Sequence, residues 1–203
     1  MTNPIGLDVS RETLDDLKSY VSILRKWNSS INLVSKSTIS DIWNRHIWDS
    51  AQLVVIVGKE TPKCWIDLGS GGGLPGLVIS ILLKGSPTKV TMIESDSRKC
   101  AFLRTVIREL KLNSDVIEGR VERLDPLNAD IISARAFADL ETLMGLTELH
   151  RKKDGICLFL KGQSHEVELT EARENWNMEV EVEPSLTSQR SCVLKIKEFS
   201  RVR

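Results

Sequence analysis

The chain has 203 residues, of which 41% are hydrophobic and 28% are charged. This length suits one α/β domain with a substantial core, and the mixed composition excludes a disordered chain. The 28 basic and 28 acidic residues give a formal net charge of zero, so the overall charge does not by itself indicate a nucleic acid or a membrane as partner. The sequence contains neither a secretory signal nor an apolar run of about 18 residues, and we expect a cytoplasmic protein that does not cross a membrane.

Two amphipathic helices are predicted in the first part of the chain. Within residues 11–27, apolar side chains recur at helical spacing, and Ser10 is suitably placed as the N-cap. A second helical pattern covers residues 40–57. Because both precede the α/β pattern, we expect residues 1–60 to form a helical cap on a core of residues 61–203, within a single domain.

From Cys64 onward, short apolar runs alternate with helical patterns, which is the signature of parallel βαβ units. The predicted strands are CWIDL, KVTMIE, SDVIE, ADIIS, GICLFLK, NMEVEVE and SCVLKIKEF. A short turn is expected around Val121, and helices are predicted at residues 75–83, 97–110, 140–151 and 164–176. The last two strand segments are close enough in the sequence to pair antiparallel. We therefore predict an α/β fold with a mainly parallel seven-stranded sheet and an antiparallel strand near the C-terminus.

The four cysteines lie far apart and show no spacing typical of a zinc site. Three of them fall in apolar runs that predict strands; the four are Cys64, Cys100, Cys157 and Cys192. We expect buried free thiols in a reducing compartment rather than metal ligands or disulfides.

A glycine-rich turn joins the first predicted strand to the helix that follows it. The turn reads Asp67-Leu-Gly-Ser-Gly-Gly-Gly-Leu-Pro-Gly76, and glycines let a ligand approach the backbone closely. Gly71, Gly73 and Gly76 also satisfy the dinucleotide fingerprint G-x-G-x-x-G, so the turn alone is compatible with NAD. Asp67 either holds the turn or faces the ammonium group of S-adenosylmethionine, a charge that NAD lacks.

Glu94 ends the second predicted strand, 18 residues after Gly76. A carboxylate at this place can accept hydrogen bonds from both hydroxyls of an adenosine ribose, which NAD and S-adenosylmethionine have in common. The chain has no second glycine fingerprint and no nicotinamide-side catalytic pair. Together with Asp67, this favours S-adenosylmethionine as the cofactor, and a glycine turn without a ligand is the remaining alternative.

Further motifs accompany the glycine turn along the chain. They are Trp27-Asn28, Asn32-Leu33-Val34, Arg45-His46-Ile-Trp-Asp49-Ser50 and Arg135-Ala136-Phe137. In this order, from about Trp27 to Gly162, the chain resembles the RsmG/GidB family. The members of this family are Rossmann-like class I methyltransferases that use S-adenosylmethionine to methylate N7 of a guanine in bacterial 16S ribosomal RNA. The resemblance implies 16S ribosomal RNA or the small ribosomal subunit as the partner, and we expect a monomer.

The resemblance also implies a set of cofactor contacts. Gly69 and Leu74 would line the methionine and ribose side of the cofactor, Val121 and Glu122 would contact the adenine, and Arg135 would close the pocket. The full set of predicted cofactor-binding residues is Asp67, Gly69, Gly71, Gly73, Leu74, Glu94, Val121, Glu122 and Arg135.

Two of these residues have a second interpretation when the resemblance is set aside. Glu122 could be a surface glutamate beside Arg123. Arg135 could bind a carboxylate bidentately, or it could pair with a helix acid such as Glu141. Spacing alone does not choose between these alternatives.

His46 and Asp49 lie three residues apart and therefore share one face of a helix. A lone histidine on a partly apolar helix is more often packed and hydrogen bonded than catalytic. The resemblance favours a role for His46 in shaping the mouth of the active site rather than in proton transfer. His46, Asp49 and Arg135 are the catalytic candidates.

The predicted reaction does not need a strong general base, because guanine N7 carries an in-plane lone pair and no proton. The chain correspondingly has SARAF after the fourth predicted strand, and not the N/D-P-P-Y/F tetrapeptide of amino-group methyltransferases. Catalysis would then depend on in-line alignment of the reacting atoms and on exclusion of water. The alternatives are a small NAD-dependent oxidoreductase and an RNA-binding assembly factor with an idle cofactor fold.

Phosphate contacts would have to come from a local basic face, because the net charge is zero. Most of the basic residues are expected to be ordinary solvated charges. The candidates are Arg25, Lys26, Arg45, Arg98, Lys99, Arg104, Arg108, residues 151–153, Lys195, Lys197, Arg201 and Arg203.

Overall fold

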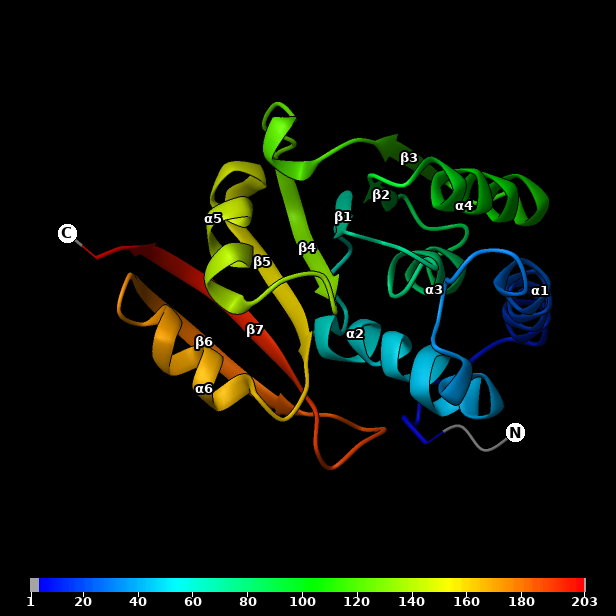
Figure 1. The fold of residues 1–203 in the computed structure, drawn as a ribbon, viewed down its shortest axis with the longest axis horizontal. Helices are drawn as coiled ribbons and strands as arrows, with labels where there is room; N and C mark the ends of the chain where they lie inside the picture. The colour runs from blue at the N-terminus through cyan, green and yellow to red at the C-terminus, as the bar shows by residue number, and fades with distance from the viewer. Residues whose placement is uncertain (1–3, 203) are drawn as a thin grey trace.

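A seven-stranded sheet forms the centre of the computed structural model, which describes residues 4–202 (Figure 1). Its strands lie in the order β3-β2-β1-β4-β5-β7-β6. Their bounds are β1 (Cys64–Leu68), β2 (Lys89–Glu94), β3 (Ser114–Glu118), β4 (Ala129–Arg135), β5 (Arg151–Lys161), β6 (Trp176–Pro184) and β7 (Cys192–Arg201).

The sheet is mainly parallel, as predicted. The neighbours from β3 to β5 all pair parallel. By contrast, β7 pairs antiparallel with both β5 and β6, so it is the antiparallel strand that the sequence predicts near the C-terminus. The chain order reverses beside β1, because β2 lies on one side of it and β4 on the other. In open α/β sheets, ligands bind at such a reversal, beyond the carboxyl ends of the strands.

The helices agree with the predicted segments except at some ends. Ser10 caps the first helix as predicted, since its side chain accepts a hydrogen bond from the backbone N–H of Thr13. The last predicted helix ends early, because Trp176 pairs in β6 and cannot also continue a helix. The bounds are α1 (Arg11–Asn28), α2 (Asp49–Val57), α3 (Gly76–Leu82), α4 (Ser97–Leu110), α5 (Leu140–His150) and α6 (His165–Ala172), with a 3-10 turn at Val121–Arg123.

The prediction of one continuous helix over residues 40–57 is wrong. Lys36–Asp41 form a 3-10 helix, Trp43–Trp48 form a π-helix, and only then does α2 begin. Apolar periodicity does not distinguish the wider π turn from an α turn, because both bury a similar stripe of side chains. The π turn is the segment that carries His46, and single π turns in proteins are frequently found at functional sites.

Side chains alternate between the two faces of the sheet, and each face has its own helices. On one face, Trp65 of β1 and Ile131 of β4 pack with Leu53 of α2 and Ile79 of α3. On the other face, the strands pack against α5 and α6. The result is a three-layer α/β/α arrangement (Figure 1).

The helical cap shares its core with the rest of the protein. Leu17, Tyr20 and Leu24 of α1 belong to the same buried cluster as Leu77 of α3 and Phe102 of α4. The Tyr20 hydroxyl also donates a hydrogen bond of 2.6 Å to the backbone carbonyl of Gly72 in the glycine turn. Burial raises the pKa of Tyr20 well above its usual range, so this hydroxyl keeps its proton. The cap is therefore bonded directly to the predicted cofactor turn.

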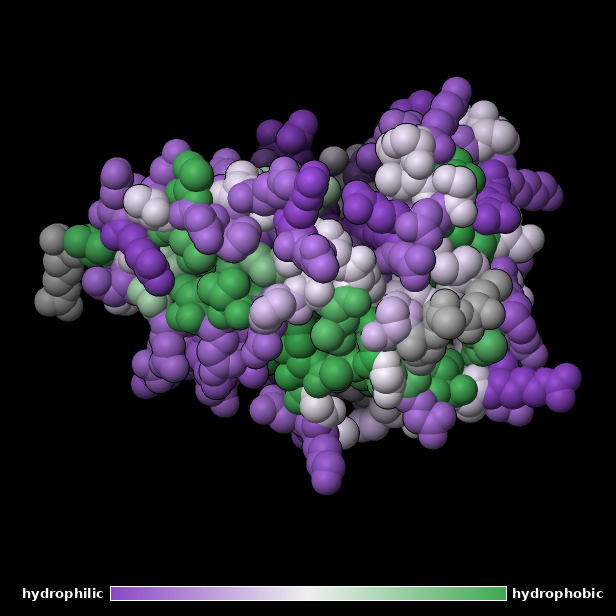
Figure 2. All heavy atoms as spheres, turned by 90° about the horizontal axis from the view of Figure 1, so that it is seen from below, coloured by the Kyte–Doolittle hydropathy of each residue, from purple (hydrophilic) through white to green (hydrophobic). Residues whose placement is uncertain are grey.

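The surface has apolar patches separated by hydrophilic side chains, as the view from below in Figure 2 shows. The most exposed large apolar residues belong to several different elements. They are Val55, Phe137, Leu149, Val167, Val182, Leu186 and Val202. Within residues 4–202, no helix is both long enough and apolar enough to span a bilayer.

The four cysteines are free thiols, and the predicted burial holds for three of them. Cys100, Cys157 and Cys192 are buried, while Cys64 is partly exposed. Burial raises the pKa of all four thiols, which keeps them protonated and unreactive.

Replacement of Tyr20 by Phe tests the bond between the cap and the glycine turn. Tyr20→Phe should lower the free energy of unfolding by about 1–3 kcal/mol, because the buried carbonyl of Gly72 loses its donor. Urea unfolding measures the change, and a single transition is expected because α1 shares its core with α3 and α4. Ser22→Ala, at an exposed position of the same helix, is the control. Equal stability of Tyr20→Phe and the wild type would mean that this bond does not hold the turn.

Candidate functional site

The predicted site residues come together at the carboxyl ends of β1, β2 and β4. Asp67 lies in β1, Glu94 ends β2 and Arg135 ends β4. Since these strands are parallel neighbours around β1, their ends lie at one edge of the sheet. This is the edge at which the chain order reverses.

Asp67 holds the glycine turn. Its side chain is fully buried, and Oδ2 accepts a hydrogen bond of 3.1 Å from the N–H of Gly76, at the far end of the turn. Oδ1 accepts a bond of 2.9 Å from the hydroxyl of Ser133 in β4. Burial raises the pKa of Asp67 to about 6, and the bonds from Ser133 and Gly76 act against that rise. The geometry favours the loop-holding alternative over contact with a cofactor ammonium group.

The glycines of the turn are required for different reasons. Gly69, Gly71 and Gly73 have φ values of +63°, +53° and +81°, in the left-handed region that favours glycine. A Cβ atom at Gly73 would lie 2.3 Å from the side chain of Leu77, so this glycine lets the turn pack on α3. A Cβ atom at Gly71 would have only the carbonyl of Gly69 within 4 Å, at 3.8 Å. Gly71 therefore keeps an open space beside the backbone.

Glu94 is a buried carboxylate, 7% exposed, that is bonded to the same turn. Oε2 accepts from the N–H of Gly71 at 2.9 Å, and Oε1 accepts from the N–H groups of Ser95 and Asp96 at 2.8 Å each. A carboxylate has about four acceptor positions, so one is left, on Oε2. Glu94 can accept one ligand hydroxyl directly, and a second hydroxyl would have to replace the bond from Gly71.

A cavity of about 280 Å³ opens beside the turn, and we call it the glycine-turn cavity. It brings together four predicted cofactor residues, namely Gly69, Glu94, Val121 and Glu122. Glu122 is exposed but lines the cavity. The remaining lining residues are Ile93, Ser95, Lys99, Gly119, Arg120, Ala136 and Phe137.

The other five predicted cofactor residues do not line this cavity. Asp67, Gly71 and Gly73 build the turn beside it, and two lie elsewhere. Leu74 is buried in the cluster that joins the cap to α3, and Arg135 lines a different cavity. Both expectations came from the family resemblance, and the order of motifs along the chain does not give side-chain direction. Instead, Phe137 covers the turn, because a Cβ atom at Gly69 would lie 2.1 Å from its ring. Phe137 belongs to the Arg-Ala-Phe motif that follows β4. An aromatic residue directly after the end of a strand is the sequence feature that indicates such a contact.

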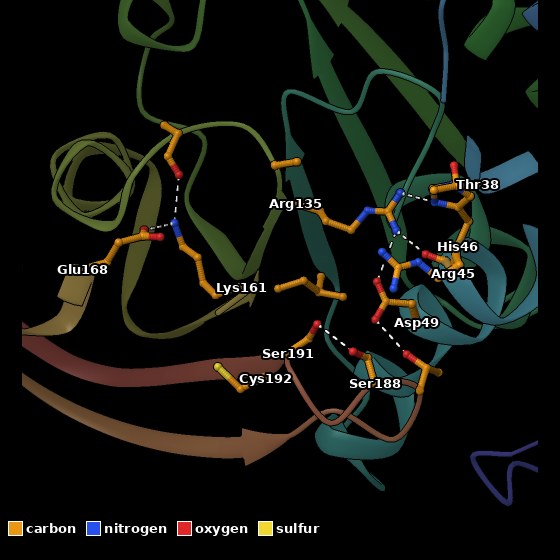
Figure 3. Close-up of a pocket in the computed structure, with 15 residues that line it drawn as sticks. Thr38, Arg45, His46, Asp49, Arg135, Lys161, Glu168, Ser188, Ser191 and Cys192 are labelled. Atoms are coloured by element: carbon orange, nitrogen blue, oxygen red, sulfur yellow. Dashed lines mark hydrogen bonds and ion pairs between the residues drawn. The ribbon is translucent and has the colours of Figure 1, made fainter. Parts of the chain in front are cut away.

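Arg135 lies in a second cavity of about 380 Å³, which we call the arginine cavity (Figure 3). Its Nη1 donates to the carbonyl of Arg45 and to Oδ2 of Asp49, both at 3.2 Å. Its Nη2 donates to Nδ1 of His46 at 2.9 Å. The structure thus brings the three catalytic candidates into one cluster and joins the π turn to the end of β4. Arg135 pairs with Asp49 and not with Glu141.

His46 is neutral in this cluster. Its Nδ1 accepts from Arg135, so the proton is assigned to Nε2, which donates to the hydroxyl of Thr38 at 2.7 Å. Burial, together with the positive charges of Arg135 and Arg45, lowers the pKa of His46 to about 4. Because both ring nitrogens are engaged, His46 has no free lone pair with which to take a proton.

The far wall of the arginine cavity comes from the C-terminal third, in which the sequence predicts no site residue. Thr187, in the loop before β7, donates to Oδ1 of Asp49 at 3.0 Å. Lys161 at the end of β5 forms an ion pair of 2.6 Å with Glu168 of α6. In the sequence, the one feature that points to this pair is a lysine at the end of an apolar strand. The lining residues from this part of the chain are Leu160, Lys161, Gly162, Glu168, Thr187, Ser188, Ser191 and Cys192.

The two cavities adjoin each other, because Ala136 lines both of them. Its neighbour Arg135 belongs to one cavity and its neighbour Phe137 to the other. A ligand in the glycine-turn cavity and a second ligand in the arginine cavity would therefore meet at this segment. Such an arrangement suits transfer of a group between two bound molecules.

Comparison with known proteins gives a consistent result. The model of the GidB family, described as rRNA small subunit methyltransferase G, matches residues 13–194. The chain is similar to Ribosomal RNA small subunit methyltransferase G of Cereibacter sphaeroides, with 47% identity over 97% of this chain and 96% of the relative. The protein of the same name from Ruegeria pomeroyi is 46% identical over 97% of this chain and 96% of the relative.

The fold has solved counterparts at low sequence identity. A SAM dependent methyltransferase from Aquifex aeolicus superimposes with a TM-score of 0.61 at 13% identity, covering 87% of this chain and 97% of the other. This likeness supports the Rossmann-like fold class. Because the family model spans most of the sequence and the relatives are nearly half identical along almost their whole length, the chain belongs to the GidB family, rRNA small subunit methyltransferase G.

Proposed function

We propose that the protein transfers a methyl group from S-adenosylmethionine to N7 of a guanine in 16S ribosomal RNA. Family membership supports a methyltransferase that acts on small-subunit ribosomal RNA. The observation that carries the proposal is the pair of cavities that meet at Ala136. One would hold the cofactor beside the glycine turn, and the other would receive the RNA base.

The residues of the glycine-turn cavity fit S-adenosylmethionine. Glu94 in the cavity wall offers an acceptor to a ribose hydroxyl, and Gly71, in the adjoining turn, leaves open space beside its backbone. Val121 and Glu122 lie where an adenine ring would be framed. When bound, the cofactor supplies a methyl group on a positively charged sulfur. The protein's contribution is to orient that methyl group toward the arginine cavity.

The arrangement of His46 and Asp49 supports alignment without a strong general base. His46 is neutral and uses both ring nitrogens in hydrogen bonds. Asp49 already accepts from Arg135, Gln52 and Thr187. These groups therefore act as positioning residues, with Arg135 fixing the π turn against the end of β4. N7 needs no proton removed before it attacks the methyl carbon.

Ion pairs within the protein reduce the number of basic residues that are free to bind RNA. Several basic candidates are paired with acids in the described part of the chain, and Arg203 lies outside the described residues. Within residues 4–202, the guanidinium of Arg45 has no hydrogen-bond or ion-pair partner and lines the arginine cavity. We propose that Arg45 contacts a phosphate next to the target nucleotide.

The remaining assignments are also proposals. The shared core of the cap and the sheet supports one domain over residues 1–203. The monomeric state stays a prediction. A ribosomal RNA substrate implies a cytoplasmic location.

Mass-spectrometric mapping of 7-methylguanosine in 16S ribosomal RNA tests the function. Cells without this protein should lack one such modification, and addition of the purified protein with S-adenosylmethionine should restore it. Both protein-free RNA and small subunits should be offered as substrates. A methyl group on another atom would contradict the N7 assignment, and binding to RNA without transfer would favour the assembly-factor alternative.

Replacement of Gly71 by Val tests the cofactor site. The β-branched side chain fills the open space beside the backbone, so calorimetry should detect no S-adenosylmethionine binding, while circular dichroism should show a folded protein. Gly85→Val is the matched control, because Gly85 also has a positive φ and open surroundings but lies away from the cavity. Gly73 is unsuitable for this test, since its replacement would collide with Leu77. Normal affinity in Gly71→Val would refute the assignment of the turn.

Replacement of Glu94 by Ala should affect both binding and stability. The variant should bind S-adenosylmethionine more weakly by about 1–3 kcal/mol, the scale of hydrogen bonds to a charged group. It should also unfold at a lower urea concentration, because the N–H groups of Gly71, Ser95 and Asp96 lose their acceptor. An unchanged dissociation constant beside reduced stability would restrict Glu94 to a structural role.

The pH dependence of methyl transfer tests the absence of a general base. Single-turnover rates on bound RNA should be flat between about pH 7 and 9, because the pKa of His46 lies near 4 and the imidazole stays neutral throughout this range. Below about pH 6, protonation of Asp67 should weaken its bond from Gly76 and lower the rate. His46→Asn should reduce the rate modestly and keep the same profile. A rise near pH 6.5 that disappears in this variant would contradict the proposal.

A further inference from the structure

A lysine–glutamate ion pair lies in the wall of the arginine cavity, across from His46 and Asp49 (Figure 3). Nζ of Lys161 donates to Oε2 of Glu168 at 2.6 Å and to the carbonyl of Ala138 at 2.8 Å. The two side chains are only 8% and 16% exposed. The pair is therefore held rigidly and is largely shielded from water.

Each member of the pair has one hydrogen-bonding position left. An ammonium group has three donors, and Lys161 uses two of them within the protein. A carboxylate has about four acceptor positions, and Glu168 uses three, for Lys161, for the N–H of Leu140 and for the hydroxyl of Ser164. The unused acceptor is on Oε1. A spare donor and a spare acceptor thus lie side by side in the cavity wall.

Glu168 remains ionised at neutral pH. Burial raises the pKa of Glu168, but the hydrogen bonds from Lys161 and Ser164 outweigh this effect, so the pKa lies below its usual value. Desolvation of two charges is costly, and a buried pair is weak evidence for stabilisation. A pair with unused positions at a cavity wall suits ligand recognition.

We infer that Lys161 and Glu168 select guanine as the target base, with Lys161 donating to O6 and Oε1 of Glu168 accepting from N1–H. This inference rests on the proposed function. Guanine presents an acceptor at O6 next to a donor at N1, which matches an ammonium next to a carboxylate. Adenine presents the inverse pattern, an amino donor next to an unprotonated N1, so each group of the pair would face a group of its own kind.

The same contacts place N7 toward the cofactor side. O6 and N7 are neighbouring acceptors on one edge of guanine, so a donor at O6 fixes the position of N7. Lys161 is bonded to Ala138, and Ala136, two residues earlier, lines both cavities. A guanine held at O6 by Lys161 therefore has N7 near the segment where the cavities meet.

Charge movement during the reaction also favours a carboxylate at N1. The lone pair of N7 forms the new N–C bond, and the electrons of the broken S–C bond remain on sulfur. Positive charge passes from the sulfur to the guanine ring, and no proton leaves N7. Glu168, at N1–H, then stabilises the ring more strongly as this charge develops.

Base substitution in the RNA tests the inference with the wild-type protein. The target guanosine is replaced by inosine, which keeps O6 and N1–H, or by 2-aminopurine, which keeps N7 but lacks both. Inosine should be methylated with a kcat/KM close to that of guanosine. 2-Aminopurine should react with a kcat/KM lower by about 10- to 100-fold, the range for loss of a paired base contact. Equal use of guanosine and 2-aminopurine would overturn the inference.

Variants of the pair separate recognition from the intrinsic reactivity of N7, which differs among these bases. In Lys161→Met and Glu168→Gln, guanosine should lose activity more than 2-aminopurine does, so the ratio between the two substrates should shrink. Lys152→Met is the matched control, because Lys152 is also in β5 and paired with an acid, Asp130, but lies outside the arginine cavity. An unchanged ratio in folded Lys161→Met and Glu168→Gln would overturn the assignment.

The outcomes also distinguish this inference from the proposed function. Thermal unfolding and S-adenosylmethionine affinity identify variants that have lost their fold, and the inosine and 2-aminopurine comparison needs no variant. If the wild-type protein methylates no guanosine in small-subunit RNA, the proposed function fails. If it methylates guanosine and rejects inosine as strongly as 2-aminopurine, only the inference fails, because the exocyclic amine at C2 would then be the recognised group.

Discussion

The buried carboxylate of Asp67 is the contact on which the site depends. It holds the glycine turn at its far end, through the N–H of Gly76, and fastens it to β4 through Ser133. A turn fixed in this way presents its backbone N–H and C=O groups to the segments packed around it. The other contacts of the site are made to individual glycines of this turn.

Each glycine of the turn contacts a different part of the molecule. Gly69 lies beneath the ring of Phe137, Gly71 donates to Glu94, and Gly72 accepts from Tyr20 of the cap. Gly73 makes room for Leu77 of α3. The cap, the second strand and the segment after β4 are therefore positioned relative to one short stretch of backbone. Displacement of the turn would disturb all of these contacts together.

Arg135 plays a corresponding part for the second cavity. Its guanidinium joins the π turn to the end of β4 through Arg45, His46 and Asp49. Since Asp49 in turn accepts from Thr187, the cap, the sheet and the loop before β7 meet at one cluster. The two cavities adjoin because the residues that build them, on either side of Ala136, are consecutive in the chain.

The sequence predicted the parts of the structure that depend on local patterns. β1, β2 and β3 begin and end at the predicted residues, because short apolar runs bounded by turn residues leave little choice of strand. The glycine turn and its acidic partner Glu94 were predicted for the same reason. The positions of Leu74 in the core and of Arg135 in the second cavity were not predicted, because side-chain direction depends on packing between distant segments. The Lys161–Glu168 pair was missed because its members become neighbours in a cavity wall only when α6 packs beside β5.

The antiparallel strand β7 has a consequence for the order in which the protein can fold during synthesis. Among the described residues β6 pairs with β7 alone, so this edge of the sheet has no partner until β7 has left the ribosome. The bond between Thr187 and Asp49 spans 138 residues of chain, and contacts of such long range form slowly. The glycine turn, whose strands and helix are all made earlier, can fold while the chain is still growing. A nascent chain thus builds the glycine-turn cavity before it acquires the wall of the arginine cavity to which Thr187 belongs.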